Sequence, residues 1–210
     1  PYADIDPVRT GDRILYVPDA GLGRVVERPA EIAGQIATFI SFQGELDPST
    51  ELVPGYGFLQ DGAQAVVDAL DALPDTTTVE AIINETWTAD DVIDQLFPLG
   101  GEAPNLASIN AHFDHYRALP ADQTAAGIED DLFTTADVDD PTRDGRLVGR
   151  ALFSMGCHGG LSVPDELFPG VVDGEALAWA QVYARQGAVW VGTTGYGYGE
   201  TEGVELSERL

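Results

Sequence analysis

The only cysteine of the chain and all three of its histidines directly follow two apolar segments that are typical of strands. Cys157 comes after residues 148–155, and His112 comes after residues 106–110. A thiol is only partly ionised at neutral pH, and an imidazole that takes its proton converts it into a strong nucleophile. The same imidazole can then protonate a leaving amine. These residue types predict acyl transfer with Cys157 as the nucleophile.

Three histidines are candidates for the base. His112 is the first candidate, His115 is the alternative, and His158 adjoins the cysteine in sequence, so that its ring can point away from the thiol. A lone cysteine after an apolar strand is also typical of a buried core residue. A histidine beside an aromatic residue, as His112 is beside Phe113, is typical of a structural histidine. The non-catalytic interpretation therefore stays open at this point.

Glycines surround the cysteine at Gly156, Gly159 and Gly160. They remove side chains from the neighbourhood of the sulfur, which lets a substrate carbonyl approach. They also let backbone N–H groups point at the oxyanion that develops on that carbonyl.

Strand and helix patterns alternate along the chain and must position these residues. Strands are expected at 12–17, 51–56, 79–84, 106–110, 148–155 and 187–192, with helices at 29–40, from Asp61 to near Pro74, at 88–97 and at 175–185. Asp61 can cap the second of these helices, and residues 88–91 resemble a capping box at the start of the third. This alternation predicts an α/β fold with a doubly wound, mainly parallel sheet and helices on both faces. Ligands bind beyond the carboxyl ends of such strands, which is where the cysteine and the histidines fall.

The charge balance excludes some partners. The chain carries 36 acidic residues against 10 basic ones, all of them arginine, for a net charge of −26. Nucleic acid and anionic membrane surfaces both need a cationic face, so neither is an expected partner. A solvated acidic surface of this kind is typical of a halophilic protein, because salt screens its self-repulsion.

The 210 residues are expected to form a single domain, residues 1–210. The chain opens Pro1-Tyr2-Ala3 without a methionine and stops at 207–210 in what reads as the start of a helix. We therefore expect a fragment truncated at both ends, cut from a larger multidomain chain. One cysteine rules out an intrachain disulfide and a cysteine-based zinc cluster.

The segment Leu152-Phe153-Ser154-Met155-Gly156-Cys157-His158-Gly159-Gly160 resembles the strand-then-cysteine element of the caspase-like cysteine peptidases, a clan that includes gingipains, clostripain, separase and caspases. Its Met155-Gly156-Cys157 triplet is most similar to separase. Residues 17–27 and 187–197 resemble the corresponding gingipain segments. The resemblance implies a gingipain-type cysteine endopeptidase that acts on peptide or protein substrates and requires no cofactor.

The resemblance also assigns roles. It places His112 at the position of the family histidine and implies Gly156 and Phe113 as the backbone donors of an oxyanion hole, with Phe113 where the family usually has glycine. Gingipain members are secreted, which favours a secreted or cell-surface location for this chain.

Substrate and metal sites follow from the same resemblance. Family members select the residue before the scissile bond in a pocket beside the cysteine, and Asp114, Met155 and Tyr196 are the candidates to line it. An acidic residue such as Asp114 would suit arginine or lysine there. The acidic stretch with Asp137, Asp139 and Asp140 is a candidate for structural Ca²⁺, which gingipains carry, and a solvated acidic loop is the alternative.

Two other functions compete with the peptidase. One is a catalytically inactive caspase-like domain that serves binding or assembly. The other is a nucleotide-binding domain, but the glycine-rich stretch 195–199 has no lysine and does not match a phosphate loop.

Overall fold

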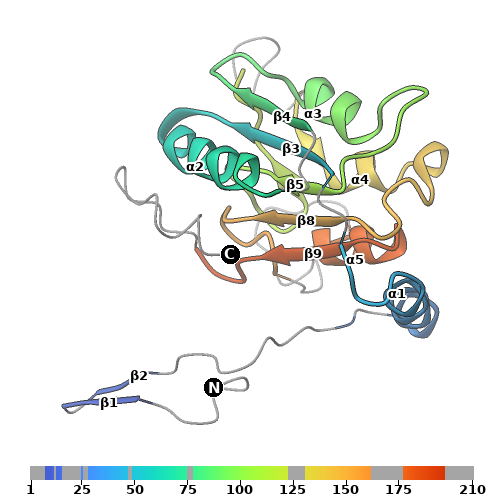
Figure 1. Cartoon of the computed structure of the whole chain (residues 1–210), viewed down its shortest axis with the longest axis horizontal. Coiled ribbons are helices and arrows are strands. Elements are labelled where there is room, and N and C mark those ends of the chain that lie inside the picture. Colours follow the sequence, from blue (N-terminus) through green and yellow to red (C-terminus); the bar gives the residue numbers. More distant parts are fainter. Residues whose placement is uncertain are drawn as a thin grey trace.

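The computed structural model describes residues 8–11, 13–15, 25, 28–46, 49–74, 78–122, 131–161 and 177–196. Its centre is a five-stranded sheet in the order β4-β3-β5-β8-β9, and every neighbouring pair is parallel (Figure 1). The strands are β3 (Thr50–Gly55), β4 (Thr78–Ile83), β5 (Leu106–Ser108), β8 (Ala151–Ser154) and β9 (Val189–Gly192). The predicted α/β fold with a mainly parallel sheet is confirmed.

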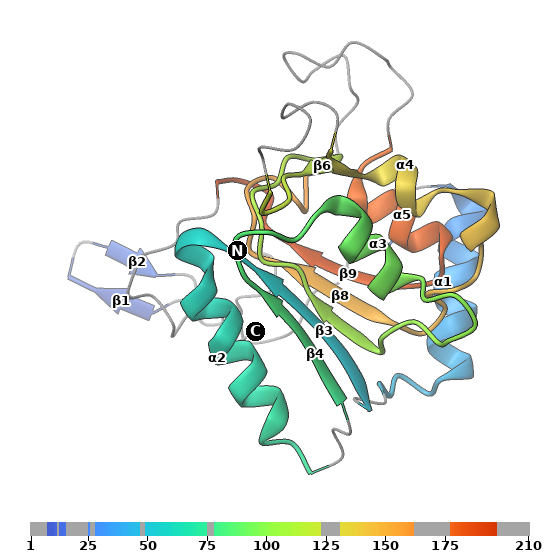
Figure 2. The ribbon, with the colours of Figure 1, turned by 90° about the horizontal axis from the view of Figure 1, so that it is seen from above.

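The strand order reverses in the middle of the sheet. The chain runs from β3 outward to β4, then returns past β3 to β5 and continues to β8 and β9. Helix α2 (Gln60–Asp71) lies on one side of the sheet, and α3 (Ala89–Leu96) and α5 (Trp179–Arg185) lie on the other (Figure 2). Since all five strands are parallel, their carboxyl ends meet at one edge.

The helix boundaries follow from capping chemistry. Thr88 caps α3 as predicted: its hydroxyl accepts the Asp91 N–H at 3.2 Å, and the Asp91 carboxylate accepts the Thr88 N–H at 2.8 Å. The predicted cap at Asp61 is wrong. A single 3₁₀ turn, η1 (Gly57–Leu59), leads into α2, so that Leu59 occupies the cap position and Asp61 lies in the first turn.

Three further elements differ from the prediction. The first predicted strand is β2 (Arg13–Leu15), but it pairs antiparallel with β1 (Val8–Thr10) in a separate two-stranded sheet. Helix α1 (Pro29–Ser41) forms as predicted, but none of its residues is buried, and its apolar face is exposed, 66% in the case of Phe39. Helix α5 begins only at Trp179; residues 175–176 lie outside the described part of the chain.

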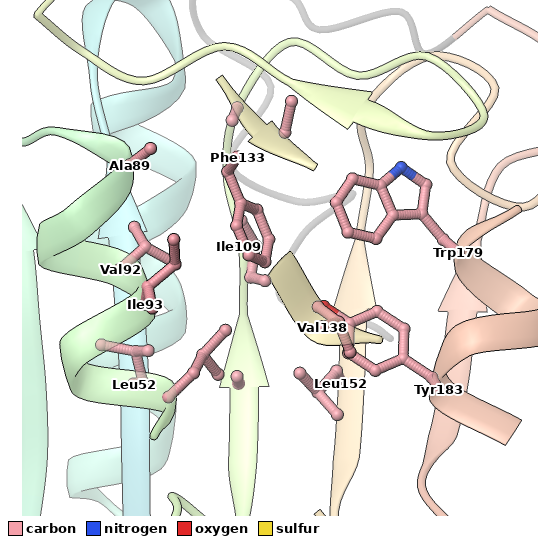
Figure 3. Close-up of a cluster of buried hydrophobic side chains, with 14 of the residues drawn as sticks. Leu52, Ala89, Val92, Ile93, Ile109, Phe133, Val138, Leu152, Trp179 and Tyr183 are labelled. Carbon is pink, nitrogen blue, oxygen red and sulfur yellow. The ribbon is translucent and has the colours of Figure 1, made fainter. Parts of the chain in front are cut away.

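Apolar side chains are buried on both faces of the sheet. The larger cluster lies between the sheet and helices α3 and α5, where Trp179 and Tyr183 pack above Leu152 (Figure 3). The smaller cluster joins Val53 to the inner face of α2. Successive residues of β3 therefore enter different clusters, which is why this strand reads as a continuous apolar run in the sequence.

One carboxyl group is buried at the start of β3. Glu51 is 2% exposed, and neither of its carboxylate oxygens has a hydrogen-bond partner among the described residues. Glu51 and Val53 are two residues apart in the strand, so both side chains lie on the face of the sheet that α2 covers. Burial, followed by the nearby charge of Asp71 at the end of α2, raises the pKa of Glu51 to about 7.

Glu51→Gln is expected to stabilise the protein at pH 8 but not at pH 4. An unfolded glutamate ionises near pH 4.3, so between that pH and about 7 the folded chain keeps a proton that the unfolded chain has lost. The free energy of unfolding therefore falls as pH rises through this window and stays low above it, and Gln removes an effect on the order of 1–3 kcal/mol. Thermal melts of both proteins at pH 4 and pH 8 measure it.

The exposed Glu80 of β4 provides the matched control. Glu80→Gln removes the same charge from the same sheet without touching a buried carboxyl, so its melting temperature is expected to stay close to that of the unmodified protein at both pH values. If Glu51→Gln raised the melting temperature equally at pH 4 and pH 8, the result would contradict the role given to the buried carboxyl group.

Stability is also expected to rise with salt. Described ion pairs join Arg117 to Asp114, Arg150 to Glu102, and Arg185 to Glu31 and Asp139. Even so, 10 arginines cannot neutralise 36 carboxylates. The midpoint of thermal unfolding should climb between dilute buffer and about 1 M KCl, where the screening length is about 3 Å. A flat or falling midpoint would remove the halophilic interpretation.

Candidate active site

Strands β5 and β8 bring His112 and Cys157 to the same edge of the sheet. The two strands pair in parallel, with Leu106 opposite Ala151 and Ser108 opposite Phe153. The Ile109 N–H extends the ladder by donating to the Phe153 carbonyl at 2.9 Å. His112 lies three residues after Ile109, and Cys157 lies three residues after Ser154, the last residue of β8, so both follow the ends of neighbouring strands at one edge of the sheet.

A direct contact joins the two loops beyond these strands. A Cβ atom on Gly156 would lie only 2.5 Å from the Phe113 ring, so that no side chain fits at position 156. Residues adjacent to His112 and to Cys157 are therefore in van der Waals contact.

Phe113 itself is buried beneath the cysteine loop. Its ring centroid lies 5.4 Å from that of Trp179 and 6.0 Å from that of Trp190. Phe113 is buried and thus belongs to the core.

His112 is exposed and stands among aromatic side chains at the end of β3. The backbone N–H of His112 donates to the Tyr56 hydroxyl at 3.3 Å, and that hydroxyl donates to the Leu119 carbonyl at 3.1 Å. The His112 ring centroid lies 5.4 Å from that of Phe58 and 6.1 Å from that of Tyr56. Sequence analysis missed Tyr56 and Phe58, although Tyr56 is the last residue of a predicted strand and Phe58 follows it at the same edge of the sheet.

The cysteine loop, residues 156–161, is held by the segment that follows β9. The His158 N–H donates to the Gly195 carbonyl at 2.7 Å, and the Gly160 N–H donates to the Thr193 carbonyl at 2.8 Å. His158 adopts a φ of 57°, a left-handed conformation that is uncommon outside glycine and reverses the chain just after Cys157.

Side chains complete this clamp. The Trp190 indole N–H donates to the Gly159 carbonyl at 2.7 Å, and the Thr193 hydroxyl donates to the Gly156 carbonyl. Gly160 and Gly192 lie backbone against backbone: a Cβ on Gly160 would come within 2.1 Å of the Gly192 carbonyl oxygen. Partly exposed Cys157 is therefore carried on a loop that is fixed on both sides of the sulfur.

The two expected oxyanion donors differ in their surroundings. The Gly156 N–H donates to the Ser154 hydroxyl at 3.0 Å, so it is already engaged. Phe113 forms an isolated antiparallel bridge with Ala118, in which the hydrogen bonds run through the flanking His112 carbonyl and Asp114 N–H. No hydrogen bond between described residues uses the Phe113 backbone N–H, in contrast to that of Gly156.

The other two histidines lie in different environments. His115 is fully buried, its ring centroid is 4.8 Å from that of Tyr116, and its carbonyl accepts the Trp179 N–H at 3.0 Å. The His158 ring lies against Tyr196, with centroids 4.6 Å apart. Of the three rings, that of His112 combines exposure with a position beyond β5.

The carboxylate of Asp114 is fully used by its own turn. One oxygen accepts the N–H groups of Tyr116 and Arg117 at 3.0 and 2.7 Å, and the other accepts the Arg117 guanidinium at 2.8 and 2.7 Å. The expectation that Asp114 presents a free charge to a basic substrate side chain is therefore not supported. Met155 is half-buried beside Gly156, and Tyr196 is 69% exposed.

The three carboxylates considered for calcium have other partners. Asp137 accepts hydrogen bonds from the Thr134 N–H and hydroxyl, and Asp139 pairs with Arg185. Asp140 accepts the N–H and hydroxyl of Thr142, which lower the pKa of its carboxyl. Within the described ranges no group of three or more His, Cys, Asp or Glu could hold a metal ion. Calcium binding stays a prediction.

Comparison with models of protein families, with curated proteins and with solved structures finds no match to this chain. In the part that the structure describes, no helix is both long and apolar enough to cross a bilayer. The fold and the site define a parallel α/β protein with a cysteine and a histidine at the carboxyl edge of adjacent strands.

Proposed function

We propose that this chain is the catalytic domain of a cysteine endopeptidase, with Cys157 as the nucleophile and His112 as the base. The observation that carries the proposal is the parallel register of β5 and β8, together with the contact between Phe113 and Gly156. These features bring the loops of the two residues together at the edge where α/β sheets bind ligands.

The proposed reaction needs only groups of the chain and water. His112 takes the thiol proton, and the Cys157 sulfur attacks the carbonyl carbon of the scissile peptide bond. The Phe113 N–H donates to the oxyanion of the tetrahedral intermediate. The carbon–nitrogen bond breaks as His112 returns the proton to the leaving amine. Water, deprotonated by His112, then hydrolyses the thioester, releases the carboxylic acid and restores the thiol.

The finer assignment is to the caspase-like, gingipain-type peptidases. It is supported by the resemblance of residues 152–160, which form β8 and the cysteine loop, and by a sheet with helices on both sides. With this assignment come a peptide or protein substrate and a secreted or cell-surface location.

Thiol chemistry tests the proposal. Iodoacetamide at pH 6 should alkylate Cys157 faster than it alkylates a cysteine in a short peptide, because an imidazole partner maintains a thiolate at that pH. The alkylated protein should lose all hydrolysis of a peptide panel that varies the residue before the scissile bond. Labelling no faster than the peptide's, together with no hydrolysis of any peptide, would contradict a peptidase.

A second candidate function is a catalytically inactive domain for binding or assembly. The exposed apolar side chains of α1, Ile36, Phe39 and Ile40, favour it. It requires slow thiol labelling, no hydrolysis, and an association in sedimentation measurements that Phe39→Ser reduces.

A further inference from the structure

A pocket of about 240 Å³ opens beside His112. Its walls include His112, Phe113, Asp114, Arg117, Leu119 and Leu132. These residues lie in the loop after β5, in β6 (Arg117–Ala118), directly after β6 or directly before β7 (Phe133–Thr134), and none of them belongs to the cysteine loop. The pocket is smaller than the roughly 300–1,000 Å³ typical of sites for drug-sized ligands and suits a single side chain.

The position of the pocket relates it to one side of the scissile bond. The sulfur attacks the carbonyl carbon, whereas the imidazole must reach the leaving nitrogen. A pocket that shares a wall with His112 and not with residues 156–161 therefore lies on the leaving-group side.

The charges in the pocket wall cancel. Asp114 and Arg117 form a two-point ion pair at 2.8 and 2.7 Å, and the Arg117 guanidinium also lies 4.6 Å from the Tyr116 ring centroid. A lysine or an aspartate entering the pocket would lose water and find its natural partner already paired, which is unfavourable. The remaining described wall, Phe113, Ala118, Leu119 and Leu132, is apolar.

We propose that this pocket binds the side chain of the residue that follows the scissile bond and selects an uncharged, apolar side chain there. The proposal rests on the proposed peptidase function and adds the substrate class on the leaving-group side. Asp114 then acts as a positioning residue that neutralises Arg117, in place of the acidic specificity residue expected from the sequence.

The test uses peptides that differ only in the residue after the scissile bond: Leu, Lys or Asp. For the unmodified protein, kcat/KM for the Leu peptide should exceed that for the Lys and Asp peptides about 10-fold or more. Arg117→Gln leaves the Asp114 charge and should shift preference toward Lys. Asp114→Asn leaves the Arg117 charge and should shift preference toward Asp. The double variant should restore the preference for Leu.

Two further variants keep the test decisive. Glu102→Gln removes a carboxylate that is 90% exposed and paired with Arg150 away from the pocket, so it should leave the preferences unchanged. Leu132→Phe narrows the pocket without touching the turn that Asp114 caps, and should shift preference from Leu to Ala.

The outcomes separate the two proposals. Hydrolysis that is equally fast for Leu, Lys and Asp peptides overturns the pocket assignment and leaves the peptidase intact. The pocket assignment is also overturned if each charge variant changes kcat/KM for the Leu, Lys and Asp peptides by the same factor. It is overturned as well if Leu132→Phe leaves the ratio of kcat/KM between the Leu and Ala peptides unchanged. Absence of hydrolysis together with slow labelling of Cys157 overturns the peptidase and the pocket together.

Discussion

Cys157→Ala is expected to abolish peptide hydrolysis while leaving the melting temperature nearly unchanged. The sulfur is partly exposed and contributes little packing. The loop that carries it is held through the backbone of its neighbours, His158, Gly159 and Gly160, and alanine preserves those hydrogen bonds. Initial rates on the peptide panel and thermal melts measure the two effects. Undiminished hydrolysis would reject the mechanism.

His112→Ala is expected to slow turnover by several orders of magnitude, because a base and its nucleophile act as one unit. His158→Asn is the matched control: it removes the imidazole next to the cysteine, and asparagine tolerates the left-handed backbone at this position. It should keep most of the activity. His115→Gln removes a buried ring and should lower the melting temperature without changing the pH profile of hydrolysis.

The reverse pattern would correct the assignment of the base. If His112→Ala kept its rate while the His115 variant lost its rate but remained folded, Cys157 would stay the nucleophile and His115 would become its partner.

Gly160→Ala is expected to disrupt the site and to destabilise the fold. The new methyl group would lie 2.1 Å from the Gly192 carbonyl oxygen and 2.6 Å from its carbon, and backbone atoms at the end of β9 cannot move aside without breaking the sheet. We expect a cost on the order of 3–5 kcal/mol, toward the upper end for single substitutions. For a chain of this size the melting temperature should fall by about 10 °C.

Gly159→Ala is the control for this effect. A Cβ at the neighbouring glycine would meet its nearest atoms, on Phe113 and Trp190, at 3.5 Å, which is ordinary van der Waals contact. Its melting temperature should change little. Equal melting temperatures for the two variants would show that the contact between Gly160 and Gly192 does not fix the loop.

The parallel direction of the strands could be predicted from the sequence, because strands and helices have distinct apolar periods. That alternation implied parallel strands, and parallel strands place the residues after residue 110 and residue 155 at one edge. The neighbouring positions of β5 and β8 confirm this inference. The capping box at Thr88 was predictable for a similar reason, since both of its partners lie within four residues.

The contacts that surround the site could not be predicted in this way. Tyr56 reaches His112 from just after β3, far earlier in the chain, and Thr193 reaches Gly160 from just after β9, so both contacts depend on the order of strands in the sheet. The pairing of Asp114 with Arg117 depends on the turn between them. Nothing in the sequence indicated that α1 would be exposed, because an amphipathic pattern shows that a helix has an apolar face but does not show what covers that face.

The hydrogen bond from Trp190 to the Gly159 carbonyl also gives the cysteine loop an optical signal. The Trp190 indole is hydrogen-bonded to Gly159, two residues after Cys157, and its ring is stacked on Tyr183 with centroids 4.8 Å apart. Of the other two tryptophans, Trp87 packs against Tyr56, and Trp179 packs against Trp190 with ring centroids 6.1 Å apart, so that Trp179 shares the surroundings of the reporter. Acylation of Cys157 that strains the loop should therefore change the intrinsic fluorescence, and rapid mixing with a peptide would resolve formation and hydrolysis of the thioester as two phases without any added label.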